Sequence, residues 1–271
     1  MRTIIDCDLP WSMSAAEKNL GITSEPGVLP RLHAYGTTQS LEAELQPYGD
    51  YADKLVDPKD FKEVIQRCHD LKIFPMYHQQ RSWAPPGYRW SQNGLNYCWS
   101  WAGIAAFMDL LAREGKLKVG DEILAAVAMG FTVGWRNAGN YLPSLIKGLK
   151  ERGCPPISFV PDEHSTRYRN YKDGWEEAAM NNRLAPDGVF DCDPRNMLQH
   201  AVTGLQTASG GYAAWNRLSH AMSVVGLIWD ESKYNNVRWV IRNSHDEDDF
   251  IEMTGRNAAP DELFFLNAST N

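Results

Sequence analysis

One cysteine stands where a polar loop meets the start of a long apolar stretch. Residues 92–97 read Gln-Asn-Gly-Leu-Asn-Tyr, and Cys98 then opens a mostly apolar run that continues to Leu111. A helix that begins at Cys98 places the sulfur near the unpaired N–H groups and the positive dipole end of its first turn, which favour the thiolate. Gln92 carries a side-chain amide suited to stabilising an oxyanion beside that sulfur. The pattern therefore predicts a nucleophilic cysteine.

A histidine and an asparagine farther along the chain complete a set suited to thiol chemistry. His220 follows Cys98 by about 120 residues and Asn243 follows it by about 145, close to a spacing of roughly 130–150 residues known for one class of thiol hydrolase. An imidazole beside a thiol takes up its proton and later delivers it to the leaving group. A third polar group fixes the orientation of the ring.

Two expected strands bring this histidine and asparagine together. Residues 221–229 and 237–242 are rich in Val, Ile and Trp, and the turn-rich stretch 230–236 separates them. If the two strands form an antiparallel hairpin that pairs His220 with Asn243, the centre of the hairpin falls inside that stretch. Two residues far apart in the sequence then become neighbours.

Helix signals dominate the first part of the chain. Asp57 as N-cap and Pro58 at the first helical position open an amphipathic helix that reaches Leu71. Apolar periodicity predicts further helices at 98–113, 121–129, 141–152 and near 193–207. Because the helical part precedes the strands, the expected fold class is α+β.

The residues around the cysteine, the histidine and the asparagine resemble the papain family of cysteine proteases. That family has a Gln, five further residues and then Cys-Trp, as at 92–99 here. Its His is followed by small and apolar residues up to a Gly, as at 220–226, and its Asn is followed by Ser, as at 243–244. A weaker likeness is Asn-Ala-Gly at 137–139, where the family has an Asn-Gly-Gly element that pairs with the bound peptide.

The resemblance implies a papain-like fold of two subdomains and hydrolysis of peptide bonds through an acyl-enzyme thioester, without a cofactor or a metal. It implies Cys98 as nucleophile, His220 as general base and acid, Asn243 as the residue that orients the ring, and Gln92 as the oxyanion-hole donor. Substrate-binding residues along the cleft are expected at Trp135, Ala138 and Gly139. The chain departs from the family at 95–97, where Cys-Gly-Ser is usual, at Ala138, and at His245, which stands where a Trp follows Asn-Ser.

The expected division of the chain is an N-terminal extension, 1–75, and a peptidase domain, 76–271. The domain divides into a mainly helical half, 76–155, and a β-rich half, 156–271. Residues 1–75 match no motif of the family's inhibitory propeptide and contain no strand-like apolar stretch. We therefore expect this extension to pack on the back of the fold and to leave the cleft open.

Composition sets further limits. The chain has 271 residues, 43% of them hydrophobic, which suits a globular protein with a large core. A net charge of −7 argues against nucleic acid as the main partner, and no apolar run reaches the length of a membrane span. Five scattered cysteines without a CxxC pair indicate free thiols in a reducing compartment and no metal site.

Two classes of function remain open. The first is an active cysteine peptidase that acts on polypeptides. The second is a papain-like domain that serves as a structural or interaction component of a larger assembly, such as a virus particle. Acyl transfer of the transglutaminase kind fits less well, because those enzymes orient the histidine with Asp. Residues 1–8 lack the apolar core of a signal peptide, so we expect a cytoplasmic or virion-associated protein.

Overall fold

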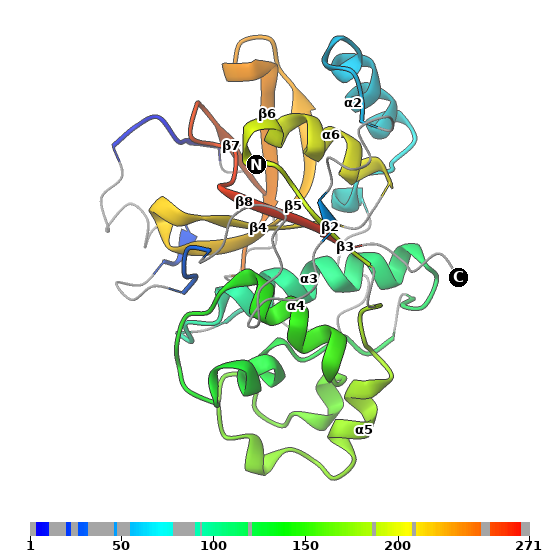
Figure 1. The fold of residues 1–271 in the computed structure, drawn as a ribbon, viewed down its shortest axis with the longest axis vertical. Helices are drawn as coiled ribbons and strands as arrows, with labels where there is room; N and C mark the ends of the chain where they lie inside the picture. The colour runs from blue at the N-terminus through cyan, green and yellow to red at the C-terminus, as the bar shows by residue number, and fades with distance from the viewer. Residues whose placement is uncertain are drawn as a thin grey trace.

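A mixed β-sheet divides the protein into an upper and a lower part (Figure 1). The computed structural model describes residues 4–10, 20–22, 27–31, 46–47, 55–77, 90–92, 94–118, 121–185, 188–207, 210–244 and 250–266. Helices α2 (Phe61–Asp70) and α6 (Met197–Thr207) lie above the sheet, and α3 (Cys98–Arg113), α4 (Leu142–Glu151) and α5 (Trp175–Met180) lie below it.

Within the described residues the sheet has eight strands in the order β1-β7-β6-β5-β4-β8-β3-β2. Pairs β1–β7 and β2–β3 are parallel, and all other pairs are antiparallel. The strands are β1 (Ile4–Asp6), β2 (Gln46–Pro47), β3 (Val189–Asp191), β4 (Gly211–Trp215), β5 (His220–Trp229), β6 (Val237–Arg242), β7 (Ile251–Thr254) and β8 (Glu262–Leu266). The N-terminal residues are thus part of the sheet, because β1 extends its edge.

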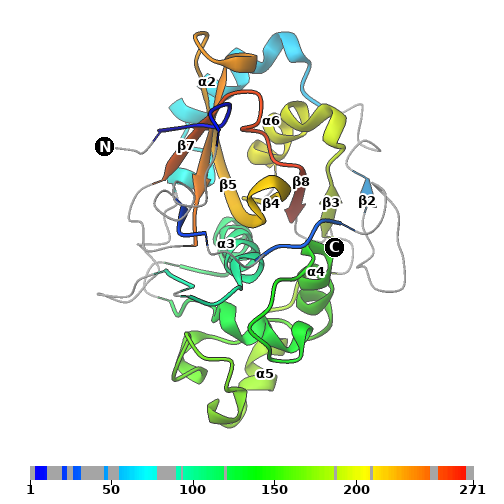
Figure 2. The same cartoon turned by 90° about the vertical axis from the view of Figure 1, so that its left-hand side faces the viewer.

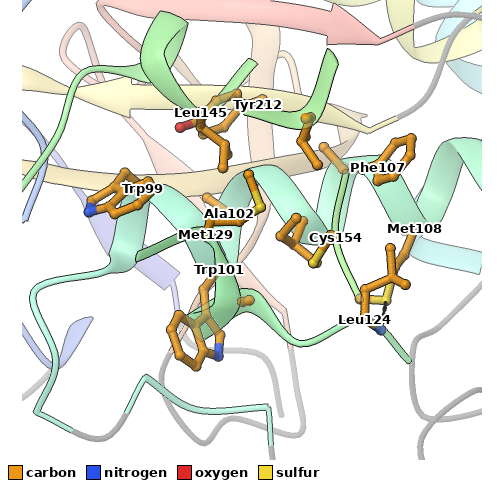
Figure 3. Packing of buried hydrophobic residues seen from close by; sticks show 14 of the residues in the cluster. Trp99, Trp101, Ala102, Phe107, Met108, Leu124, Met129, Leu145, Cys154 and Tyr212 are labelled. Atoms are coloured by element: carbon orange, nitrogen blue, oxygen red, sulfur yellow. Dashed lines mark hydrogen bonds between the residues drawn. The ribbon is translucent and has the colours of Figure 1, made fainter. Parts of the chain in front are cut away.

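Helix α3 is the structural centre of the lower part. Every residue from Cys98 to Leu111 is buried, which explains why this helix is apolar all round and not amphipathic. It packs against β4 and β5 on one side and against α4 on another. Gly103 permits the close approach of α4 and β4, since a Cβ there would overlap the side chain of Leu145 and meet the Tyr212 ring. Figure 3 shows the side chains that fill this core around α3.

A second core lies on the other face of the sheet. Phe61, Val64, Ile65 and Cys68 form the buried side of α2, and they join Val202 of α6 and the upward-facing side chains of β5 and β6. Asp57 was predicted to cap this helix, but it caps the 3₁₀ helix Pro58–Asp60 that precedes it, where its side chain accepts from the backbone N–H of Lys59. Helix α2 itself begins only at Phe61, and its N-cap residue, Asp60, makes no side-chain cap. The helix ends at Asp70, one residue earlier than expected, and Leu71 is 65% exposed.

The predicted helix at 121–129 is wrong in type and position. The backbone of residues 123–125 pairs instead with residues 155–157 in an extended arrangement, with Ala125 N donating to Pro155 O (2.9 Å) and Ile157 N to Ile123 O (2.9 Å). Only afterwards does a 3₁₀ helix form, Ala126–Val133. Gly134 ends it in the left-handed region, with φ of 60°. The other predicted helices are present, with α4 and α6 close to their expected limits.

The hairpin that carries His220 and Asn243 exists, but its register differs from the expected one. Ser223 is opposite Arg242. Asn243, which follows β6, therefore lies diagonally from His220 and not directly across from it. An irregularity between Val224 and Gly226 shifts the pairing by one residue along the remaining strand. A bulge of this kind cannot be located from alternation, because both β5 and β6 are buried on both faces.

Candidate active site

Cys98 is the first residue of α3, and its side chain is completely buried. Its sulfur accepts a hydrogen bond from the backbone N–H of Ala221, the second residue of β5, at 3.4 Å. Burial raises the pKa of the thiol to about 12, although the N–H groups of Ala221, Trp99 and Cys98 act in the opposite direction. In this conformation desolvation outweighs the helix start, and Cys98 is a neutral thiol, contrary to the thiolate expected from the sequence.

His220 and Asn243 meet side chain to side chain. Nε2 of His220 lies 2.9 Å from Oδ1 of Asn243, and both residues are buried. The amide orientation of Asn243 is consistent with its neighbours, because Oδ1 also accepts from Ser244 N (2.8 Å) and Nδ2 donates to Leu20 O (2.9 Å). Since Oδ1 accepts, Nε2 carries a hydrogen. A neutral ring with this tautomer has Nδ1 as its acceptor.

Gln92 is tied to the same corner of the molecule. Its Oε1 accepts from the Ser244 hydroxyl at 2.5 Å, its backbone N donates to Ser244 O at 2.8 Å, and its Nε2 donates to Leu95 O at 2.6 Å. The loop before α3 is therefore fixed to the residue that follows Asn243. Among the described residues, this amide has no acceptor other than Leu95 O, and its second N–H is the kind of group that an oxyanion would need.

The four residues singled out for chemistry thus come from four places in the fold. Cys98 comes from the head of α3, His220 from the start of β5, and Asn243 from the end of β6, while Gln92 lies in the loop ahead of α3. Ala221 connects the cysteine to the histidine strand, and Ser244 connects the glutamine to the asparagine. That His220 exchanges a proton with Cys98 stays a prediction.

The expected substrate-binding residues have different surroundings. Trp135 is half-buried in an aromatic cluster, stacked on Tyr168 at 4.6 Å between ring centroids and edge-on to Tyr171 and Trp175. The carbonyl of Ala138 accepts from Trp99 Nε1 at 3.2 Å, which joins this loop to the start of α3. Gly139 is half-buried beside it, but the backbone pairing expected of this glycine belongs to Asn140, as described next. His245 lies outside the described residues.

Residues 27–31 cover the cysteine. A Cβ on Gly27 would lie only 2.5 Å from the Cys98 sulfur, so the glycine backbone rests directly on the thiol. Gly27 N and Val28 N both lie 3.1 Å from Ser219 O, and Val28 forms a parallel β-bridge with Asn140. In Figure 2 this segment runs in blue from beside α3, over α4, toward β3. The expectation that residues 1–75 leave the cleft open was therefore wrong.

Arg31 fastens the far end of this segment to the sheet. Its Nη2 lies 2.8 Å from Asp191 Oδ2, its backbone N donates to Glu262 Oε1 at 3.0 Å, and its guanidinium carbon lies 5.0 Å from the centroid of the Phe264 ring. Sequence analysis did not single out any of these residues. The available signal was the short run Gly-Val-Leu between two prolines, because residues before proline favour extended backbone.

Other kinds of site have no support among the residues that the structure describes. No group of three or more His, Cys, Asp or Glu side chains there could hold a metal ion. All five cysteines are free and buried. No helix in the described part of the chain is both long and apolar enough to cross a membrane.

Comparison with known proteins was made by sequence and by structure. No family model matches the chain, and no curated protein matches it. Among solved structures, xylellain, a cysteine protease from Xylella fastidiosa, is similar at 14% identity and a TM-score of 0.54, with 89% of this chain and 99% of that chain covered.

Two further solved structures are similar to the same degree. The recombinant stem bromelain precursor gives 14% identity and a TM-score of 0.57 over 88% of this chain and 78% of that one. Procathepsin L 3 of Tenebrio molitor larval midgut gives 15% identity and a TM-score of 0.51 over 70% of this chain and 68% of that one. These likenesses, together with the helical lower part and the mixed sheet, show that the chain has the papain-like α+β fold.

Proposed function

We propose that this protein is a papain-like cysteine peptidase, and that the conformation described is its closed form. The observation that carries the proposal is the hydrogen bond between Nε2 of His220 and Oδ1 of Asn243, because a neutral ring oriented in this way has Nδ1 as its acceptor, and the next residue, Ala221, donates to the Cys98 sulfur. A buried histidine oriented in this way beside a cysteine at a helix start is the arrangement that activates a thiol.

The reaction begins once residues 27–31 leave the thiol. Nδ1 of His220 takes the proton of Cys98, and the thiolate attacks the carbonyl carbon of the peptide bond. The negative charge on the carbonyl oxygen is stabilised by the second N–H of the Gln92 amide and by the backbone N–H of Cys98. As the C–N bond breaks, the imidazolium gives its proton to the leaving amine. Water, deprotonated by His220, then hydrolyses the thioester and restores the thiol.

Closure accounts for the neutral state of the cysteine. With Gly27 on the sulfur, solvent is excluded and the pKa of Cys98 is raised to about 12. Departure of the segment admits water and exposes the sulfur to the imidazole and the helix start, both of which favour the thiolate. The N-terminal segment is therefore inhibitory in this proposal, even though it lacks a propeptide motif.

Complete burial of Cys98 also favours the second candidate, a papain-like component of a larger assembly without catalysis. The two are separated with a peptidyl epoxide and mass spectrometry. The peptidase proposal expects the full chain, opened by Arg31→Ala, to gain the mass of one inhibitor on Cys98 and to hydrolyse a mixed fluorogenic peptide pool. Cys98→Ala in the same background should do neither. Absence of both reactions in the opened chain would leave the assembly role.

A further inference from the structure

The N-terminal residues hold the amide of Asn243 as well as covering the thiol. Nδ2 of Asn243 donates to Leu20 O at 2.9 Å, and both residues are buried. At the other end of the same side chain, Ser244 N donates to Oδ1 at 2.8 Å. Backbone groups of opposite character therefore meet the two ends of the Asn243 amide, a carbonyl at Nδ2 and an N–H at Oδ1.

This arrangement decides which way the amide faces. Rotated by 180°, the amide would direct Oδ1 at the Leu20 carbonyl and Nδ2 at the Ser244 N–H, so that an acceptor would face an acceptor and a donor a donor. Buried polar groups without a partner are costly, which disfavours the rotated form. Leu20 O therefore contributes to keeping Oδ1 of Asn243 directed at Nε2 of His220, 2.9 Å away.

The orientation of the amide in turn determines the tautomer of His220. With Oδ1 as its partner, Nε2 of a neutral ring carries the hydrogen, and Nδ1 is the acceptor. With Nδ2 of Asn243 as its partner, Nε2 would have to accept, and Nδ1 would carry the hydrogen. A ring in that second tautomer could not take a thiol proton at Nδ1, and a wrong tautomer is costly in hydrolases that use an oriented histidine.

Leu20 is fixed by its own side chain and by the two residues that follow it. The side chains of Leu20 and Ile22 are 0% and 6% exposed and belong to the core above the sheet. Gly21 between them has a φ of 64°, in the left-handed region that favours glycine. Rotation about the N–Cα bond of Gly21 turns the peptide group that contains Leu20 O, so the conformation of this glycine directs the carbonyl at Asn243.

The first described residues are bound on the histidine side as well. Arg217 lies shortly before His220, and its Nη1 donates to Cys7 O at 2.8 Å. Cys7 is completely buried and directly follows β1, which pairs with β7. The N-terminal residues thus have two kinds of contact with the site. One kind supports the elements that carry the histidine and the asparagine, and the other, made by residues 27–31, covers the sulfur.

We propose that Leu20 is a positioning residue of the active site, because its backbone carbonyl keeps the Asn243 amide in the orientation that gives His220 its working tautomer. This inference rests on the proposed peptidase function. The backbone around Leu20 then belongs to the working enzyme, and only the cover, residues 27–31, has to leave the thiol when the cleft opens.

The experiment turns the Leu20 carbonyl away by strain at Gly21. Valine is strongly disfavoured at a φ of 64°, so Gly21→Val should rotate this peptide group and leave Nδ2 of Asn243 without its acceptor. In the full chain carrying Arg31→Ala, alkylation of Cys98 by iodoacetamide is timed between about pH 4 and pH 10. We expect the midpoint of the profile to rise by about one pH unit, as for a tenfold loss of the thiolate–imidazolium pair. With fluorogenic peptides, kcat should fall about tenfold and KM should change less.

Two comparisons separate positioning from a general loss of structure. Gly115→Val introduces a similar strain, at a φ of 70°, just beyond the end of α3 opposite Cys98, and it should leave the profile unchanged. In Asn243→Ala, which already lacks the amide, Gly21→Val should add no further shift, because residues that act through one another give non-additive effects. Gly21→Ala is less strained and should give a smaller shift in the same direction. It covers the case in which circular dichroism shows that the valine variant does not fold.

The outcomes distinguish this inference from the proposed function. An unchanged profile in the folded Gly21 variants, an equal shift in Gly115→Val, or full additivity with Asn243→Ala would overturn the positioning role and leave the peptidase proposal intact. The expected shifts without hydrolysis of any peptide would support the positioning role and contradict the peptidase. A parent profile with the midpoint of an ordinary thiol, at about pH 8.5, that Asn243→Ala does not change would overturn both.

Discussion

Replacement of Gly27 by alanine should uncover Cys98. The new Cβ would lie 2.5 Å from the sulfur, about 1 Å inside an ordinary contact of roughly 3.5–4.0 Å. The backbone of Gly27 is outside the left-handed region, so alanine meets no backbone strain there and the clash is the whole effect. The sulfur accepts a hydrogen bond from Ala221 N–H at 3.4 Å, so displacing it from its present position also disturbs that bond.

The size of the effect follows from the cost of overpacking. Forcing an extra methyl group into a filled site costs about 1–3 kcal/mol, and each 1.4 kcal/mol changes an equilibrium tenfold. If closure is in rapid exchange with an open form, the population of the open form rises about 5- to 150-fold. Alkylation of Cys98 should accelerate by the same factor, since a thiol with a pKa of about 12 supplies almost no thiolate at neutral pH in the closed form.

The assay is a timed exposure to iodoacetamide at pH 7.5, followed by proteolysis and mass spectrometry of the Cys98 peptide. Cys68, buried in the core above the sheet, reports global unfolding in the same samples. The matched control is Gly226→Ala, whose Cβ would lie 2.6 Å from the Met76 sulfur and would meet none of residues 27–31. Equal acceleration in both variants, or alkylation of parental Cys98 at the rate of a free thiol, would refute closure by residues 27–31.

Three further predictions concern the surrounding groups. Gln92→Ala, measured with fluorogenic peptides in the opened chain, should lower kcat by about 10²–10³ and change KM less, because the amide acts mainly on the oxyanion; equal kinetics would remove Gln92 from the mechanism. Glu262→Gln should raise the melting temperature relative to the parent more at pH 8 than at pH 5. The reason is that the pKa of Glu262 is about 7 in the folded protein and lower in the unfolded chain, so the parent loses stability as the pH rises from the unfolded pKa to about 7, whereas the glutamine variant does not. A difference in melting temperature that is the same at both pH values would contradict this. Asp109→Asn should cost about 3–5 kcal/mol in urea unfolding, because it leaves the buried Arg242 guanidinium, 2.9 Å from Asp109 Oδ2, without its counter-charge; a loss below 1 kcal/mol would show that Arg242 finds other partners.

The elements that carry the site were predictable because their signals are local. Helix α3 begins at Cys98 and ends at Arg113 as expected, since a polar glycine loop precedes it and Gly115 follows it. Strand β6 has its predicted limits, 237–242, because β-branched and aromatic residues are enclosed by turn residues. The hairpin register was missed by two residues, as no pattern in a doubly buried strand marks a bulge.

The N-terminal residues could not be placed from their own sequence. Strand β1 has three residues and is stabilised by parallel pairing with β7, more than two hundred residues away. Residues 27–31 are extended because Ser219 and Asn140 supply their hydrogen-bond partners and because two buried carboxylates receive Arg31. Neither cause is visible in a window of sequence. Charge gave no hint either, since one arginine among 27 basic residues is unremarkable until its partners are known.

The same N-terminal residues contact the site at three points, and this limits how the closed form can open. Leu20 O accepts from the Nδ2 of Asn243, Gly27 rests on Cys98, and Arg31 is bonded to Asp191 and Glu262. Deleting everything up to residue 56 would remove all three contacts, but it would also expose the edge of β7 by removing β1. A rise in thiol reactivity after such a deletion would therefore mix loss of the cover with damage to the sheet. Point substitutions at Gly27 and Arg31 leave β1 in place, so any reactivity they release belongs to the cleft.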